Sequence, residues 1–362
     1  MIKANKGEWS ELYAFLKILI DRKIFAADAD LNIIPDKHFE VLKIIRQESS
    51  VDKTYDVSVP EKITISVGSE GVSEFVVVDP LKLKKKVRAF FDEIKNSSGR
   101  SFGVSMAIEL MEELKCIKVK AKNKNKADII LIIHDRIAST YPELGFSIKS
   151  RIGKPATLLN ASGATNFIFK LVVTKKARES KSQKLKDGMS TIADRLEDIE
   201  YGSDLCFFGM QNETFEANLR RIDTVLPEIL AEIIKTYYRK PVRSLVELID
   251  KLDEIESLKS EYGLGKADYV YKIKKFLVAI ALGMTPAKKW DGLTVAHGGY
   301  IIVKEDGEVV CYHLYNRDEF EEYLFKNSRL ETGSPSRHRF GQSYEEKGEN
   351  YLKLNLQIRF IK

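Results

Sequence analysis

The most constraining feature of the sequence is a pair of apolar segments that carry charged residues at matching ends. Residues 128–133 read DIILII, and after a turn the segment 145–149 reads GFSIK. Short apolar runs bounded by turn residues are typical of buried strands. The two segments therefore predict a β-hairpin, with Asp128 near the start of one arm and Lys149 near the end of the other.

This hairpin can carry phosphodiester chemistry. Side chains alternate along a strand, so Ser147 and Lys149 share a face while Ile148 points to the other. Carboxylates hold hard divalent cations, and a neighbouring lysine orients a water and offsets developing charge. This arrangement resembles the PD-(D/E)xK nucleases, with Asp128 as the first acid and Lys149 as the lysine. Taken alone, the hairpin fits an ordinary strand pair with a solvated edge lysine better than a catalytic site.

The second acid of that pattern is replaced by Ser147, and a hydroxyl is a poor metal ligand. A further carboxylate must therefore come from elsewhere if a metal is held firmly. Glu143 lies just upstream in the turn, and the segment NKGEWSEL offers Glu11 and Glu8. We favour Glu11 over Glu8. The ordinary alternative is that both glutamates are solvent-facing charges of an amphipathic helix.

The rest of the chain predicts a mixed α/β protein. Apolar spacing indicates a helix over 7–22, and alternation indicates a strand pair over 55–67, broken at Pro60. Further elements are expected at these positions: helices within 80–115, 214–240, 243–260, 268–283 and 317–327, a hairpin over 298–316, a polar loop over 333–342 and a strand over 351–361. We expect residues 1–200 to form a nuclease core with a helical insertion near 80–115, and 201–362 to form a helical and α+β region for DNA recognition and dimer contacts.

Composition narrows the function classes. The 362 residues carry a net charge of +6, which is compatible with a polyanionic partner. The three cysteines form no C-x-x-C pair, so a zinc site or a disulfide framework is not expected. The first residues contain no apolar signal segment, and no apolar run approaches the roughly 20 residues that span a bilayer. We expect a cytoplasmic protein without membrane contact.

Several segments, in order, resemble the HpaII-like type II restriction endonucleases, a branch of the PD-(D/E)xK superfamily. The resemblance extends over most of the chain, through these segments: NKGEWSELY (5–13), LGFSIKSRIGKPATLLNASGATNF (144–167), FFGMQNETFEANL (207–219), GGYIIVKEDGEVVCYHLYNRDEFEEYL (298–324), SPSRHRFG (334–341) and LKLNLQIRF (352–360). It implies a PD-(D/E)xK core and Mg²⁺-dependent cleavage of double-stranded DNA at a short palindrome. The name-giving member cuts within CCGG, which makes CCGG one candidate target here.

The resemblance also implies roles for residues. Asp128 would bind the metal, Lys149 would contact the attacking water or the scissile phosphate, Ser147 occupies the acid's position, and Glu11, Glu8 or Glu143 would complete the metal ligands. Candidate DNA contacts fall into a loop after Lys149 and a second group: Arg151, Lys154, Asn160, Ser162, Thr165 and Asn166, then Gln211, Asn212, Arg337, His338 and Arg339. Each of these residues is, taken singly, more often ordinary surface. Arginines rank first for a guanine-rich target.

Phosphate contacts are expected from the lysine-rich run that includes Lys120, Lys122, Lys124 and Lys126, and from 175–186. A palindrome implies a homodimer and, for a restriction-modification system, a methyltransferase encoded elsewhere. Two alternatives remain open. The chain could be a structure-selective repair or junction nuclease on the same core, or a non-catalytic DNA-binding module, as Ser147 suggests.

Overall fold

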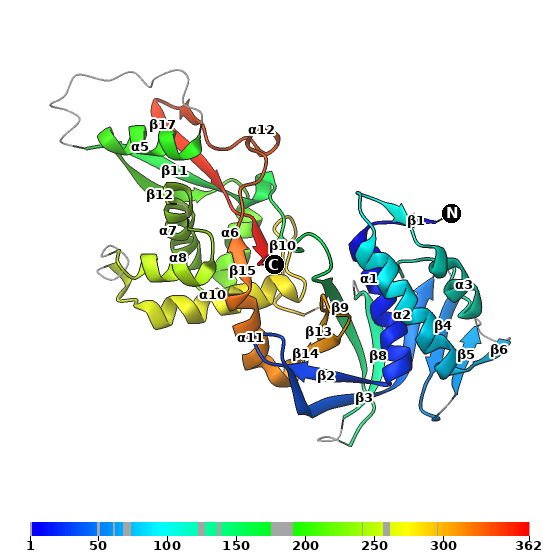
Figure 1. Cartoon of the computed structure of the whole chain (residues 1–362). Helices are drawn as coiled ribbons and strands as arrows, with labels where there is room; N and C mark the ends of the chain where they lie inside the picture. Colours follow the sequence, from blue (N-terminus) through cyan, green and yellow to red (C-terminus); the bar gives the residue numbers. More distant parts are fainter. Residues whose placement is uncertain are drawn as a thin grey trace. The chain divides into compact units, whose positions relative to one another are not determined.

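The computed structural model describes residues 2–48, 51–60, 62–67, 74–121, 127–135, 139–174, 191–240, 242–255, 261–294 and 296–361. They form two compact units (Figure 1). Unit 1 contains residues up to 156 together with 294–323, and unit 2 contains 157–293 and 324–361. Both units combine helices with sheets, as the predicted mixed α/β class requires. In the described ranges, every helix is too short or too polar to span a bilayer.

Unit 1 is built on a nine-stranded mixed sheet with the strand order β2-β14-β13-β9-β8-β3-β4-β5-β6. Its strands are β2 Lys23–Ala27, β3 Ile33–Glu48, β4 Val51–Asp56, β5 Ile63–Val67, β6 Glu74–Val78, β8 Ile129–His134, β9 Glu143–Ser150, β13 Gly299–Val303 and β14 Val309–His313. A separate pair joins β1 Lys3–Ala4 to β7 Phe102–Gly103. The predicted hairpin is confirmed, because β8 and β9 pair antiparallel.

The hairpin β13–β14 lies in unit 1, although the sequence analysis placed residues 298–316 in a separate C-terminal region. β13 pairs parallel with β9, which sets Tyr300 beside Ser147 and Ile302 beside Lys149. The predicted division into 1–200 and 201–362 therefore differs from the observed units. Local sequence patterns cannot reveal this pairing, since the partners are about 150 residues apart and each strand reads as an ordinary apolar run.

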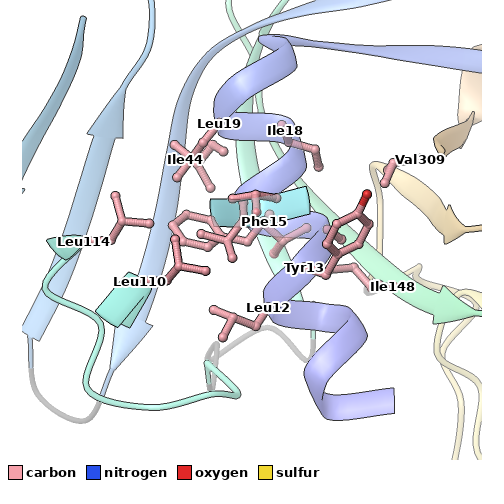
Figure 2. Packing of buried hydrophobic residues seen from close by; sticks show 14 of the residues in the cluster. Leu12, Tyr13, Phe15, Ile18, Leu19, Ile44, Leu110, Leu114, Ile148 and Val309 are labelled. Atoms are coloured by element: carbon pink, nitrogen blue, oxygen red, sulfur yellow. The ribbon is translucent and has the colours of Figure 1, made fainter. Parts of the chain in front are cut away.

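The helix α1 Lys6–Asp21 packs on this sheet together with α2 Pro80–Asn96 and α3 Ser105–Glu113 (Figure 1). Its apolar stripe is deeply buried, and Phe15 and Leu19 lie against Ile44 of β3 (Figure 2). Ile148 of β9 points into the same cluster. Burying each such side chain stabilises the fold by about 1.5–3 kcal/mol, so α1 is held firmly against β9.

Unit 2 contains a four-stranded sheet of order β12-β11-β17-β16 and a three-stranded sheet of order β10-β18-β15. Its strands are β10 Thr157–Leu159, β11 Asn166–Val173, β12 Ser203–Met210, β15 Ser328–Leu330, β16 Ser343–Glu346, β17 Glu349–Asn355 and β18 Ile358–Phe360. The remaining helices are α5 Ile192–Gly202, α6 Glu213–Ile222, α7 Leu226–Arg239, α8 Leu245–Leu252, α10 Lys266–Ala281, α11 Arg317–Lys326 and α12 Pro335–His338, with short 3₁₀ turns at Gly163–Thr165 and Leu314–Asn316. The division between the units falls inside α11.

Three predicted elements differ in detail. The helix expected over 214–240 is two helices, because Asp223 caps the C-terminus of α6 and Pro227 begins the first turn of α7. The strand expected over 351–361 is interrupted, and there the Leu356 amide donates to the Thr165 carbonyl. The loop expected at 333–342 contains the four-residue helix α12. Of the helix expected over 243–260, residues 256–260 lie outside the described ranges.

Candidate active site

The hairpin β8–β9 brings Asp128 close to the segment of β9 that carries Ser147 and Lys149. The ladder ends at Ile129↔Phe146, and Asp128 lies directly before β8, where its amide donates to the Phe146 carbonyl at 2.9 Å. Ser147 and Lys149 share one face of β9, because residues two apart on a strand point to the same side. The Asp128 carboxylate is fixed further by the Ile148 amide, which donates to Oδ2 at 2.8 Å.

Glu11 of α1 joins Asp128 through a lysine. The Lys120 Nζ lies 2.9 Å from Glu11 Oε1 and 3.6 Å from Asp128 Oδ1. The two carboxylates are largely shielded, with side-chain exposures of 15% and 17%, whereas Lys120 is 48% exposed. Glu11 on α1 and Asp128, directly before β8, therefore both contact the ammonium group of Lys120, although they are more than 100 residues apart in the chain.

The pKa of Glu11 reflects its closeness to the other charged residues of this site. The pKa of Glu11 is raised from 4.5 to about 7, because burial and the nearby Asp128 charge raise it more than Lys120 and Lys149 lower it. Burial acts to lower the pKa of Lys120, but the two carboxylates outweigh it and the pKa is raised. Glu11 thus interacts electrostatically with Asp128, Lys120 and Lys149 together. Two carboxylates held close together repel each other when both are ionised, so a nearby positive charge stabilises them.

Lys149 lies beside an aromatic residue that the sequence analysis did not single out. Its Nζ is 5.5 Å from the centre of the Tyr300 ring, and Tyr300 is 2% exposed. Tyr300 stands next to Ser147 across the β9–β13 ladder, so it shares the face of the lysine. A cation over a ring face gains roughly 0.5–2 kcal/mol. No local signal pointed to Tyr300, because its position depends on the parallel pairing of β13.

Two of the candidate acids lie elsewhere. Glu8 forms the capping box of α1: its amide donates to Asn5 Oδ1 at 3.0 Å, and its Oε2 accepts from the Asn5 amide at 2.9 Å. Glu143 is exposed at the opposite end of β9, across from Ile132. It stands four residues before Ser147, about 13 Å along a strand. Of the three alternatives, Glu11 is therefore the one beside Asp128, and we do not propose Glu8 or Glu143 as ligands.

The chemistry of the donor set suits a hard cation. Glu11 and Asp128 offer carboxylate oxygens, the ligand type that Mg²⁺ prefers. Within the described ranges, no group of three or more His, Cys, Asp or Glu gathers in a metal-binding arrangement. A divalent ion bound here would take carboxylate oxygens from Glu11 and Asp128, and Mg²⁺ characteristically keeps several waters in sites of this kind.

Some of the predicted DNA contacts have structural roles. Thr165 and Asn166 are completely buried. Asn212 caps α6, where its Oδ1 accepts from the Phe215 amide at 2.8 Å. The Arg151 side chain hydrogen-bonds to the buried Tyr323. Base contacts by Thr165 and Asn166 are excluded in this conformation because their side chains do not reach the surface.

Asn166 instead joins the loop after Lys149 to both segments of the second group of candidate DNA contacts. Its Nδ2 donates to Gln211 Oε1 at 2.9 Å and to the His338 carbonyl at 2.8 Å, and its Oδ1 accepts from Asn355 Nδ2 at 2.7 Å. Unit 2 therefore gathers residues 160–166, 211–212 and 337–339. The exposed candidates among the described residues are Lys154, Asn160, Gln211, Arg337 and Arg339, while Ser162 and His338 are half-buried.

A basic cavity of about 580 Å³ lies beside α12. Its described lining includes Arg195, Arg339 and Lys353, with serine and glutamine side chains and no acid. Such a lining favours an anion such as a backbone phosphate. Lys122, Lys124 and the 175–186 run lie outside the described residues.

Comparison with known proteins matches residues 5–360 to the family described as HpaII restriction endonuclease. A curated relative, the type II restriction enzyme HpaII of Haemophilus parainfluenzae, is 37% identical over 365 aligned residues, which cover 99% of this chain and 98% of the relative. No solved structure matches. Both similarities extend through the segments that carry Glu11, Asp128 and Lys149.

Proposed function

The chain belongs to the HpaII restriction endonuclease family, and from this membership we propose that it hydrolyses double-stranded DNA at a short palindrome with Mg²⁺. The observation that carries the proposal is the grouping of Glu11, Asp128 and Lys149 in a chain that is 37% identical to a type II restriction enzyme. Membership supports a site-specific deoxyribonuclease. The PD-(D/E)xK core, the metal and the target sequence belong to the proposal.

In this proposal Asp128 and Glu11 hold the metal. When bound, a divalent cation polarises the scissile phosphate and lowers the pKa of a water. Asp128 and Lys149 both interact electrostatically with Glu11, and the Lys149 ammonium would contact the attacking water or a phosphate oxygen and offset the charge that develops there. Tyr300 under the ammonium restricts its position.

The proposed metal site contains two carboxylates although residue 147 is a serine. Ser147 occupies the acid's position on β9, and in this proposal Glu11 supplies the second carboxylate from α1 instead. The Ile148 amide also fixes the orientation of the Asp128 carboxylate. This arrangement favours a catalytic protein over the non-catalytic DNA-binding module.

DNA recognition is assigned to unit 2. Arg337 and Arg339 are exposed on and beside α12, and guanidinium groups form two hydrogen bonds with guanine, which suits a target such as CCGG. The basic cavity and the lysine-rich runs would contact phosphates and position the duplex. A palindromic target also favours a homodimer with one site per strand, and a cognate methyltransferase acting on the same sequence.

Digestion of a sequenced phage genome with Mg²⁺ tests the proposal, with EDTA as the control. We expect a fixed set of fragments whose mapped ends share one palindrome, and no cleavage in EDTA. Nicking confined to branched substrates would favour a junction nuclease instead. Absence of any metal-dependent cleavage would contradict catalysis. Sedimentation of the protein with a duplex containing the mapped target then tests the dimer.

A further inference from the structure

Lys120 is placed by a buried group of charges. Arg46, Glu48 and Lys53, on β3 and β4, are 4%, 0% and 1% exposed. Glu48 accepts from Arg46 at 3.0 Å through Oε1 and from Lys53 Nζ at 2.6 Å through Oε2. We call these three residues the buried charge cluster. Burying such groups is costly unless further hydrogen bonds satisfy them.

The further hydrogen bonds go to the segment that ends at Lys120. The Ile117 amide donates to Glu48 at 2.7 Å, and Arg46 donates to the carbonyls of Lys118 and Val119 at 2.7 and 3.2 Å. Lys53 donates to the Lys115 carbonyl. Residues 115–119 are therefore held against the sheet by the side chains of the buried charge cluster, which are shielded from solvent.

This anchoring distinguishes Lys120 from an ordinary surface lysine. The residue directly before it is held by Arg46, and its ammonium bridges Glu11 and Asp128 from that fixed base. A single positive charge between two carboxylates occupies the electrostatic position that a divalent ion would take. The half-exposed side chain can leave this position by rotation about its own bonds.

We propose that Lys120 is an internal counter-ion of the metal-free enzyme, which holds Glu11 and Asp128 together and competes with the divalent cation for them. The inference rests on the proposed metal site. A lysine that must be displaced lowers metal affinity, because the ion pairs that it makes are lost when the metal binds. In return, the two acids stay oriented without a metal, since their mutual repulsion is offset.

The test measures Ca²⁺ binding by calorimetry to the intact, DNA-free protein. Ca²⁺ is a hard cation with the same preference for oxygen ligands. In Lys120→Met, which keeps length and loses charge, we expect Ca²⁺ to bind about tenfold more tightly, a change of about 1.4 kcal/mol. The metal-free variant should also melt at a lower temperature, and Ca²⁺ should raise its melting temperature more than that of the wild type.

Lys118→Met is the matched control. Lys118 is exposed on the same anchored segment, so the variant changes net charge equally without touching the carboxylates. Its Ca²⁺ affinity should equal that of the wild type. The proposed role of Lys120 would be wrong if Ca²⁺ affinity rose by the same factor in both variants. It would also be wrong if Ca²⁺ binding to Lys120→Met were unchanged or weaker.

Two further variants separate this inference from the proposed site. Glu11→Gln and Asp128→Asn should each weaken Ca²⁺ binding at least tenfold. If they do and Lys120→Met does not tighten it, the counter-ion alone is wrong. If neither weakens binding, the metal site itself is misplaced, and both the inference and the proposed ligands fail.

Discussion

At the scale of single residues, Lys149 is the most direct test of the proposed chemistry. Lys149→Ala removes the ammonium beside the acids but leaves the β8–β9 ladder and the buried Ile148 in place. We expect the cleavage rate to fall by about 10²–10³-fold or more, since a positioned charge stabiliser is lost. Single-turnover cleavage of a mapped target, with binding of the same duplex measured separately, checks this. Normal cleavage by the variant would remove Lys149 from the mechanism.

Glu11 predicts a pH dependence of stability. Burial raises its pKa from 4.5 to about 7 in the folded, metal-free protein. Between those values the folded state binds more protons than the unfolded state, so the free energy of unfolding falls as pH rises from about 4.5 to 7 and then levels off. The full contribution is on the order of 3 kcal/mol, reduced by the partial exposure of the side chain.

Glu11→Gln cannot titrate and serves as the reference. Urea unfolding in EDTA at several pH values should show the wild type losing stability relative to this variant over that window. A difference between the two proteins that is constant from pH 4 to 8 would show that the carboxyl is not perturbed by burial.

At the scale of elements, the segment between α3 and β8 depends on the buried charge cluster. Glu48→Ala leaves Arg46 and Lys53 buried without their acid, and removes the acceptor of the Ile117 amide. We expect a loss of about 3–5 kcal/mol in the free energy of unfolding. Urea denaturation measures it. The exposed Glu112→Ala on α3 is the control, which should change stability by less than about 1 kcal/mol.

The elements also show how sequence patterns fail. The helix over 7–22 and the second strand of the pair expected over 55–67 were predicted because one local period dominates each of them, whereas the first strand of that pair lies earlier, at Val51–Asp56. The split into α6 and α7 was missed because apolar residues continue through the break, where Asp223 pairs with Lys272 of α10. That ion pair joins residues far apart in the chain, so no local window contains it.

At the scale of the whole molecule, recognition and cleavage are assigned to different compact units. We expect Arg337→Ala to weaken binding of the mapped target by about 1–3 kcal/mol, or roughly 5- to 150-fold, and to relax preference at one base pair. Fluorescence anisotropy with Ca²⁺ in place of Mg²⁺ measures this. Arg88→Ala, which changes the same charge on the exposed face of α2, is the control. Equal losses on cognate and unrelated duplexes would show that Arg337 contacts phosphates only.

The sequence by itself determined the hairpin and the family, because strand alternation and ordered local segments depend on neighbouring residues. It left three acids as alternatives for the second carboxylate. Only the tertiary structure placed Glu11 beside Lys120 and Asp128 and buried Asn166, because both outcomes depend on which distant elements pack together. The same holds for Tyr300 and Lys120, since parallel pairing and buried charge contacts join residues that no local pattern relates.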